Sequence, residues 1–171
     1  MHYRILPLAA LLLVGSCAPH PDQPRVECLQ NLHRISRLLR ALEEEKGLEP
    51  RPGAEYLLQI LPGLAEHEQS FLVCPLDPDR ATTRCSYRGP DAAFLASEAA
   101  DRSSPESRAK ILACCACGDG GDEAWHPDGV CVVYVRGATR FIPWSELEGC
   151  EGGPVKIGPD SPDPRFRHLV R

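Results

Sequence analysis

The nine cysteines of this 171-residue chain constrain it more than any other feature. That number is unusual for a small cytosolic enzyme, whereas in exported proteins cysteines commonly form disulfide frameworks. Whether the chain is exported therefore decides how its cysteines are interpreted. The length fits one domain, since a single core commonly takes about 100–200 residues.

The first sixteen residues predict an export signal. Arg4 precedes ten apolar residues, 5–14, which only Pro7 interrupts. This stretch matches the apolar region of a signal peptide and is too short to span a bilayer, which takes about 20 apolar residues. Small residues then lead directly to Cys17, and the sequence Val-Gly-Ser-Cys resembles the bacterial lipoprotein signal.

That resemblance implies cleavage before Cys17 and acylation of its thiol. Residues 1–16 are then the signal peptide, and residues 17–25 form a Pro-rich tether on a lipid anchor. The expected location is the bacterial cell envelope, on a membrane and facing the periplasm or the exterior. An ordinary secretory signal with an incidental cysteine is the alternative.

Eight cysteines remain after Cys17, an even number that favours a disulfide framework in an exported protein. The candidates are Cys28, Cys74, Cys85, Cys114, Cys115, Cys117, Cys131 and Cys150. The sequence fixes no connectivity. Cys74 with Cys114 or Cys115 is a plausible cross-strand pair, because each ends a predicted strand.

The rest of the pattern predicts an α+β fold. An apolar stripe at helical spacing predicts a long helix over residues 26–46, ended by Gly47, with Arg34, Arg37 and Arg40 on a solvated face. A short helix is expected at 54–61, strands at 70–74, 82–88 and 110–115, and a hairpin of 130–135 with 138–142.

The long N-terminal helix would pack on this four- to five-stranded antiparallel sheet. The predicted domain covers residues 26–148. Residues 149–171 are expected to form a Gly- and Pro-rich, mostly irregular tail.

Two stretches together resemble type II secretion pseudopilin-like proteins that carry His, nine residues and Asp-Gly. One contains Cys28-Leu-Gln-Asn31-Leu, and the other runs from His126 through Gly129 to Arg136-Gly137. The resemblance implies a pilin-like head whose last hairpin carries this motif. Arg136 replaces the family's Asp, while Gly137 keeps the residue suited to a positive φ.

The pilin N-terminal apolar helix is missing, because a lipoprotein-like signal stands in its place. The chain is therefore expected not to polymerise as a pilin does. The resemblance instead implies an interaction module that contacts envelope or secretion-system proteins.

The sequence gives weaker support to nucleic-acid binding, enzymatic activity and metal binding. The formal net charge of −5 argues against a nucleic-acid partner, and neither hydrolase nor phosphate-binding motifs occur. We therefore expect a non-enzymatic protein without a cofactor. The alternative is a metal-binding or catalytic exported lipoprotein that uses the Cys114, Cys115, Cys117 and His126 region, although adjacent cysteines suit one tetrahedral zinc ion poorly.

Overall fold

A 24-residue helix, α1 (Gln23–Lys46), and a five-stranded antiparallel sheet confirm the predicted α+β class. The computed structural model describes residues 22–78, 85–97, 100–115, 126–149 and 156–171. The sheet order is β4-β3-β2-β1-β5. Its strands are β1 (Tyr87–Pro90), β2 (Ile111–Cys115), β3 (Gly129–Tyr134), β4 (Thr139–Pro143) and β5 (Leu169–Val170).

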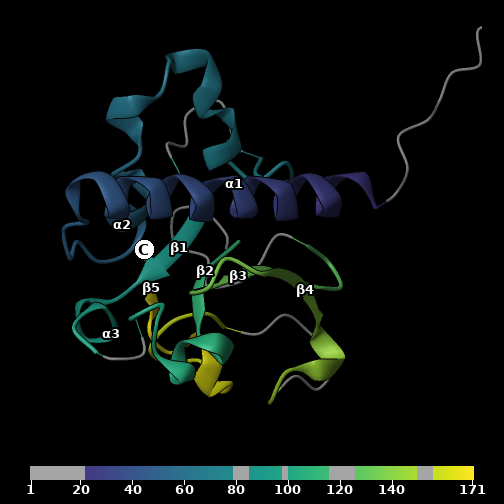
Figure 1. Cartoon of the computed structure of the whole chain (residues 1–171). Coiled ribbons are helices and arrows are strands. Elements are labelled where there is room, and N and C mark those ends of the chain that lie inside the picture. The colour runs from purple at the N-terminus through teal and green to yellow at the C-terminus, as the bar shows by residue number, and fades with distance from the viewer. Residues whose placement is uncertain (1–21, 79–84, 98–99, 116–125, 150–155) are drawn as a thin grey trace, which may run out of the picture.

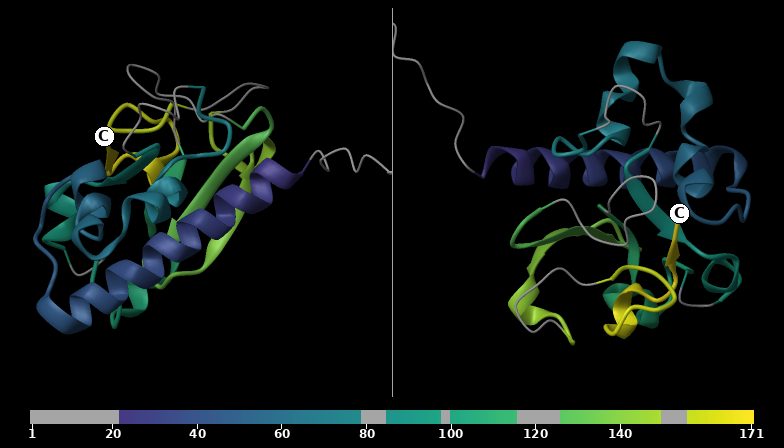
Figure 2. Two further views of the ribbon diagram at one scale, coloured as in Figure 1. Left: turned by 90° about the horizontal axis from the view of Figure 1, so that it is seen from above. Right: turned by 180° about the vertical axis from the view of Figure 1, so that it is seen from behind.

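Helix α1 lies between the sheet and the segment that follows α2 (Ala54–Leu58), as Figures 1 and 2 show. The predicted apolar stripe is confirmed, with Cys28, Leu32, Ile35 and Leu39 fully buried. The helix begins at Gln23 rather than at residue 26, because a proline is tolerated in the first turn of a helix. Within the described residues, no helix has the length and apolarity needed to cross a membrane.

The predicted strand over residues 70–74 is wrong. Residues 70–72 instead belong to a 3₁₀ helix, η2 (Glu66–Leu72), which follows η1 (Leu61–Gly63), and residues 73–74 lie in neither a helix nor a strand. The Glu68 carboxylate accepts the backbone N–H of Ala65 at 3.2 Å and caps the helix start. Phe71 and Leu72 are buried, and so short an apolar run reads equally well as a strand or a buried helical turn.

The predicted hairpin is confirmed as β3 paired with β4. Gly137 lies in the turn at φ 90°, which favours glycine. The Arg136 guanidinium donates to the Ser104 carbonyl at 2.8 Å and to Ser107 Oγ at 3.2 Å, joining this turn to η3 (Pro105–Ala109). Arg136 therefore has a structural role in this turn.

The strand predicted at 82–88 corresponds to β1 at 87–90, and residues 79–84 lie outside the described part. A short helix, α3 (Ala92–Leu95), follows β1, and Asp91 caps its start. The helical turn η4 (Trp144–Glu146) follows β4 directly.

The C-terminal residues contribute more to the fold than their composition suggests. Strand β5 pairs with β1, with Leu169 opposite Pro90. Leu169, Ile157 and Phe166, the last in η5 (Pro164–Phe166), are buried in the hydrophobic core. The segment is largely irregular, yet it closes one edge of the sheet and fills part of the core.

Candidate metal centre

Four metal-ligating side chains meet between α1 and the sheet. They are Cys28, Cys115, His126 and Cys131, whose donor atoms all lie within 4.8 Å of one another. The three cysteines are fully buried, and His126 is 2% exposed. Such a buried group of soft donors is a plausible binding site for a metal ion.

Local structure explains how each donor reaches the centre. Cys28 belongs to the buried stripe of α1, Cys115 ends β2, and Cys131 lies within β3. The antiparallel register pairs Cys114 with Val132 and so makes Cys115 and Cys131 neighbours. His126 lies just before β3.

A fifth donor, Cys74, lies beside Cys28 and His126, two residues after the end of η2. Its Sγ is 3.8 Å from Sγ of Cys28 and 3.7 Å from Nε2 of His126. It is also fully buried. The centre therefore offers one donor more than a tetrahedral ion uses.

The spacing of the donor atoms suits a tetrahedral ion. Sulfur ligands about 2.3 Å from zinc lie about 3.8 Å apart at the tetrahedral angle. Sγ of Cys131 lies 3.6 Å from Nε2 of His126, and no two of the four donor atoms lie more than 4.8 Å apart. The sulfurs of Cys28 and Cys74 are 3.8 Å apart, which is much longer than the S–S bond of a disulfide, about 2.05 Å.

In the metal-free centre, Cys115 is a thiolate and His126 is an imidazolium. Burial alone raises the pKa of Cys115, but hydrogen bonds with Cys131, Cys28 and His126 outweigh it and bring this pKa well below its usual value. Burial alone lowers the pKa of His126, but hydrogen bonds with Cys115, Cys131 and Cys74 raise it to about 12. Cys115 thus carries negative charge beside protonated His126.

The other three thiols differ in their affinity for protons. The hydrogen bond with Cys115 is the main cause of the raised pKa of Cys28, and it also raises that of Cys131 to about 11. The pKa of Cys74 is instead lowered to about 7, chiefly by its hydrogen bond with Cys28. Cys28 and Cys131 are therefore protonated at neutral pH in the metal-free protein.

Surrounding residues hold the donors in place. The Tyr87 hydroxyl donates to Sγ of Cys28 at 3.9 Å, and Asn31 Nδ2 donates to the carbonyl of Val73, next to Cys74, at 3.3 Å. The ring of Phe141 meets His126 edge-on, with 6.2 Å between centroids. Such outer contacts commonly orient metal ligands.

Trp144 fixes the chain that follows His126. Its indole N–H donates to the carbonyl of Pro127 at 2.9 Å, and its backbone N–H donates to the carbonyl of Asp128 at 3.1 Å. Trp144 is itself buried.

The structure bears on only some of the predicted cysteine assignments. All six cysteines in the described residues are free thiols. Cys17, Cys117 and Cys150 lie outside those residues, so lipidation and any disulfide through Cys117 or Cys150 stay predictions. Cys74 follows η2 and does not end a strand, which removes the reason for a cross-strand pair with Cys114 or Cys115.

Of the predicted metal-binding region, Cys115 and His126 belong to the group of four close donors. Cys114 takes no part, because neighbouring strand residues point to opposite faces of a sheet. Sequence reasoning missed Cys28 and Cys131 as ligands. Two features of the sequence could have identified them as buried neighbours: Cys28 lies on the apolar stripe of the predicted helix, and Cys131 lies in the strongest predicted strand.

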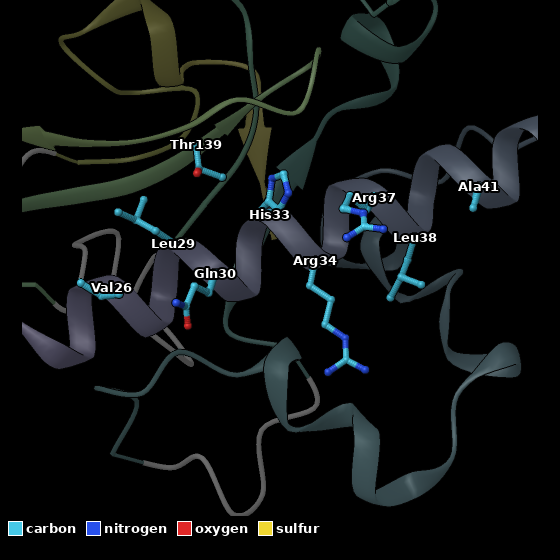
Figure 3. A pocket seen from close by; sticks show the side chains of 9 residues that line it. All are labelled: Val26, Leu29, Gln30, His33, Arg34, Arg37, Leu38, Ala41 and Thr139. Carbon is cyan, nitrogen blue, oxygen red and sulfur yellow. The ribbon is translucent and has the colours of Figure 1, made fainter.

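A separate groove of about 700 Å³ follows the outer side of α1. Figure 3 shows that it is lined by Val26, Leu38 and Arg34 among others, with Thr139 contributed by the hairpin. Arg34 pairs with Glu68 at 3.6 Å and stacks over Phe71, and Arg40 donates to the carbonyl of Arg136. These two arginines therefore make intramolecular contacts on a face that the sequence predicts to be simply solvated.

Comparison with protein-family models, curated proteins and solved structures finds no match to this chain. Function is therefore inferred from the site.

Proposed function

We propose that this protein is an exported, non-enzymatic zinc-binding domain, held on a bacterial membrane by a lipid at Cys17. One Zn²⁺ is bound by Cys28, Cys115, Cys131 and His126. The observation that carries the proposal is the buried meeting of these four donors within 4.8 Å.

Ligand chemistry supports zinc. Three thiolates and an imidazole form a Cys₃His set, which is common in structural zinc sites, whereas calcium and magnesium prefer oxygen ligands. Catalytic zinc sites keep a position open for water or substrate, but here four protein donors complete the coordination. The burial of all four side chains further favours a structural role.

The ion stabilises the fold by joining separate elements. Its ligands come from α1, β2, β3 and the turn before β3. Binding to the folded chain alone stabilises that state by mass action. Apparent zinc-binding free energies of about 10–16 kcal/mol in small zinc domains show how large this contribution becomes.

The cellular role is proposed from the sequence. The lipoprotein-like signal supports membrane attachment, and a long helix on an antiparallel sheet is the arrangement expected of a pilin-like head. We propose that the domain contacts envelope or secretion-system proteins and does not polymerise.

Elemental analysis of the full chain, purified from envelope fractions, tests the metal proposal. We expect one zinc per chain in the unaltered protein and in the matched control Cys85→Ala/Cys114→Ala. We expect loss of zinc in Cys115→Ala/Cys131→Ala. Native protein that contains no zinc, or a Cys115→Ala/Cys131→Ala variant that retains zinc, would overturn the proposal.

A further inference from the structure

The centre holds five donors for an ion that uses four, and the position of Cys74 sets it apart. Cys28, Cys115 and Cys131 lie on a helix or a strand, whereas Cys74 follows η2 on a segment with neither. Within the ligand set it contacts Cys28 and His126. Its sulfur is therefore a neighbour of two ligands rather than one of the four mutually close donors.

We propose that Cys74 is a site of oxidative modification, at which a peroxide triggers a Cys28–Cys74 disulfide and releases the zinc ion. This inference rests on the proposed function, because it requires a bound ion. It assigns Cys74 the role of sensing thiol and Cys28 that of both ligand and resolving thiol.

The chemistry balances with hydrogen peroxide as the oxidant. The Cys74 thiolate attacks one peroxide oxygen, the O–O bond breaks, and the departing hydroxide takes a proton to leave as water, giving a sulfenic acid. The Cys28 thiolate then attacks the Cys74 sulfur, and the sulfenic hydroxyl leaves with a proton as a second water. The two sulfurs lose two electrons in total, and the peroxide gains them.

Geometry selects Cys28 as the thiol that resolves the sulfenic acid. The two sulfurs are 3.8 Å apart, so side-chain rotation has to bring them about 1.8 Å closer to reach disulfide length. A sulfur in a disulfide no longer supplies a thiolate ligand. The ion then loses one of its four protein donors and dissociates.

Access to Cys74 does not require the sheet to open. Hydrogen bonds hold its segment in place, from Asn31 to the Val73 carbonyl, from the Asp77 N–H to the Cys74 carbonyl, and from Ser86 Oγ to the Asp77 carboxylate. These contacts, together with the backbone bond from the Ser86 N–H to the Leu72 carbonyl, lie outside the strand ladder. Segments of this kind open locally at a smaller free-energy cost than core strands.

Zinc release from the full-length, zinc-loaded protein tests the inference. Hydrogen peroxide is added, free zinc is measured with a chromogenic chelator, and peptide mapping identifies the disulfides. The unaltered protein should release its zinc at the same rate as the disulfide-linked Cys28–Cys74 peptide appears. Cys74→Ala should bind one zinc and release it at least about tenfold more slowly, while Cys114→Ala should behave like the unaltered protein.

The outcomes separate the two proposals. An unaltered protein without zinc contradicts the proposed function. A zinc-loaded protein that forms a different disulfide, or a Cys74→Ala variant that releases zinc as fast as the unaltered protein, overturns the role of Cys74 alone. Loss of zinc binding in Cys74→Ala also overturns that role, because it makes Cys74 a required ligand. Peptide mapping of the unaltered protein tests the role of Cys74 even if the variant does not fold.

Discussion

The backbone N–H of Cys131 donates a hydrogen bond to Sγ of Cys115 across 3.2 Å. This bond links β3 to the last residue of β2, and it joins two residues of the candidate centre through the sheet itself. An N–H donor stabilises negative charge on sulfur, as either a free thiolate or a metal ligand requires. The sheet register thus positions two of the four proposed ligands, Cys115 and Cys131, before any ion is bound.

The protonation of the centre predicts the pH dependence of zinc binding. At neutral pH the raised pKa values of Cys28, Cys131 and His126 keep protons on all three groups, whereas Cys115 has already lost its proton. Zinc must displace these three protons. Affinity should therefore fall steeply as pH falls through neutrality, approaching about 1,000-fold per pH unit where all three protons are displaced.

Titration calorimetry in buffers of different ionisation enthalpy counts the released protons. Three per zinc ion is the expected number near pH 7. Release of fewer than two would mean that the metal-free donors are already deprotonated, contrary to the charge distribution described above.

Replacing Tyr87 with Phe tests the contacts around the ligands. The change removes the hydroxyl that donates to Sγ of Cys28 at 3.9 Å and keeps the buried ring. Loss of such an outer contact typically weakens metal binding by about 10–100-fold. Competition with a zinc chelator should show this loss for Tyr87→Phe and none for Tyr134→Phe, a change outside the centre; equal affinities would mean that the Tyr87 hydroxyl does not support the ligands.

Gly129 is predicted to tolerate no side chain. A Cβ atom there would overlap the Ile142 carbonyl oxygen and the Phe141 ring, whereas nothing lies within 4 Å of one built on Gly63. Urea unfolding should show Gly129→Ala destabilised by about 1–3 kcal/mol. Gly63→Ala should stay within about 0.5 kcal/mol of the unaltered protein. Similar stabilities for both variants would argue against the close approach of β3 and β4.

The C-terminal segment is predicted to be part of the cooperative fold. Phe166 is fully buried, and truncation of such a ring to Ala typically costs about 3–5 kcal/mol. Urea unfolding of Phe166→Ala should show a loss of this size, with exposed Lys156→Ala as the control. An unchanged midpoint for Phe166→Ala would mean that residues 156–171 do not belong to the core.

The sequence predicted features that depend on short-range patterns. The buried stripe of α1 repeats every three or four residues, and the turn between β3 and β4 carries Gly137 at the required positive φ. The strand predicted at residues 70–74 was wrong because this apolar run is too short to distinguish a strand from a helical turn. Strand β5 has two residues, too few to show an alternating pattern.

The candidate centre depends on relationships that a linear pattern does not contain. Cys114 and Cys115 are adjacent in the sequence, but the alternation of a strand sends their side chains to opposite faces. Cys131 joins Cys115 through the β2–β3 register, and Cys28 joins them because the face of α1 that carries it packs on the sheet. Both facts come from tertiary structure.

X-ray absorption at the zinc edge of the full-length protein tests the proposed Cys₃His centre most directly, because it counts the atoms bound to the ion. We predict three sulfurs at about 2.3 Å and one nitrogen at about 2.0–2.1 Å. His126→Ala should lose the nitrogen signal, and Cys114→Ala should leave the spectrum unchanged. A coordination sphere of oxygen and nitrogen without sulfur, or native protein that contains no zinc, would contradict the proposed centre.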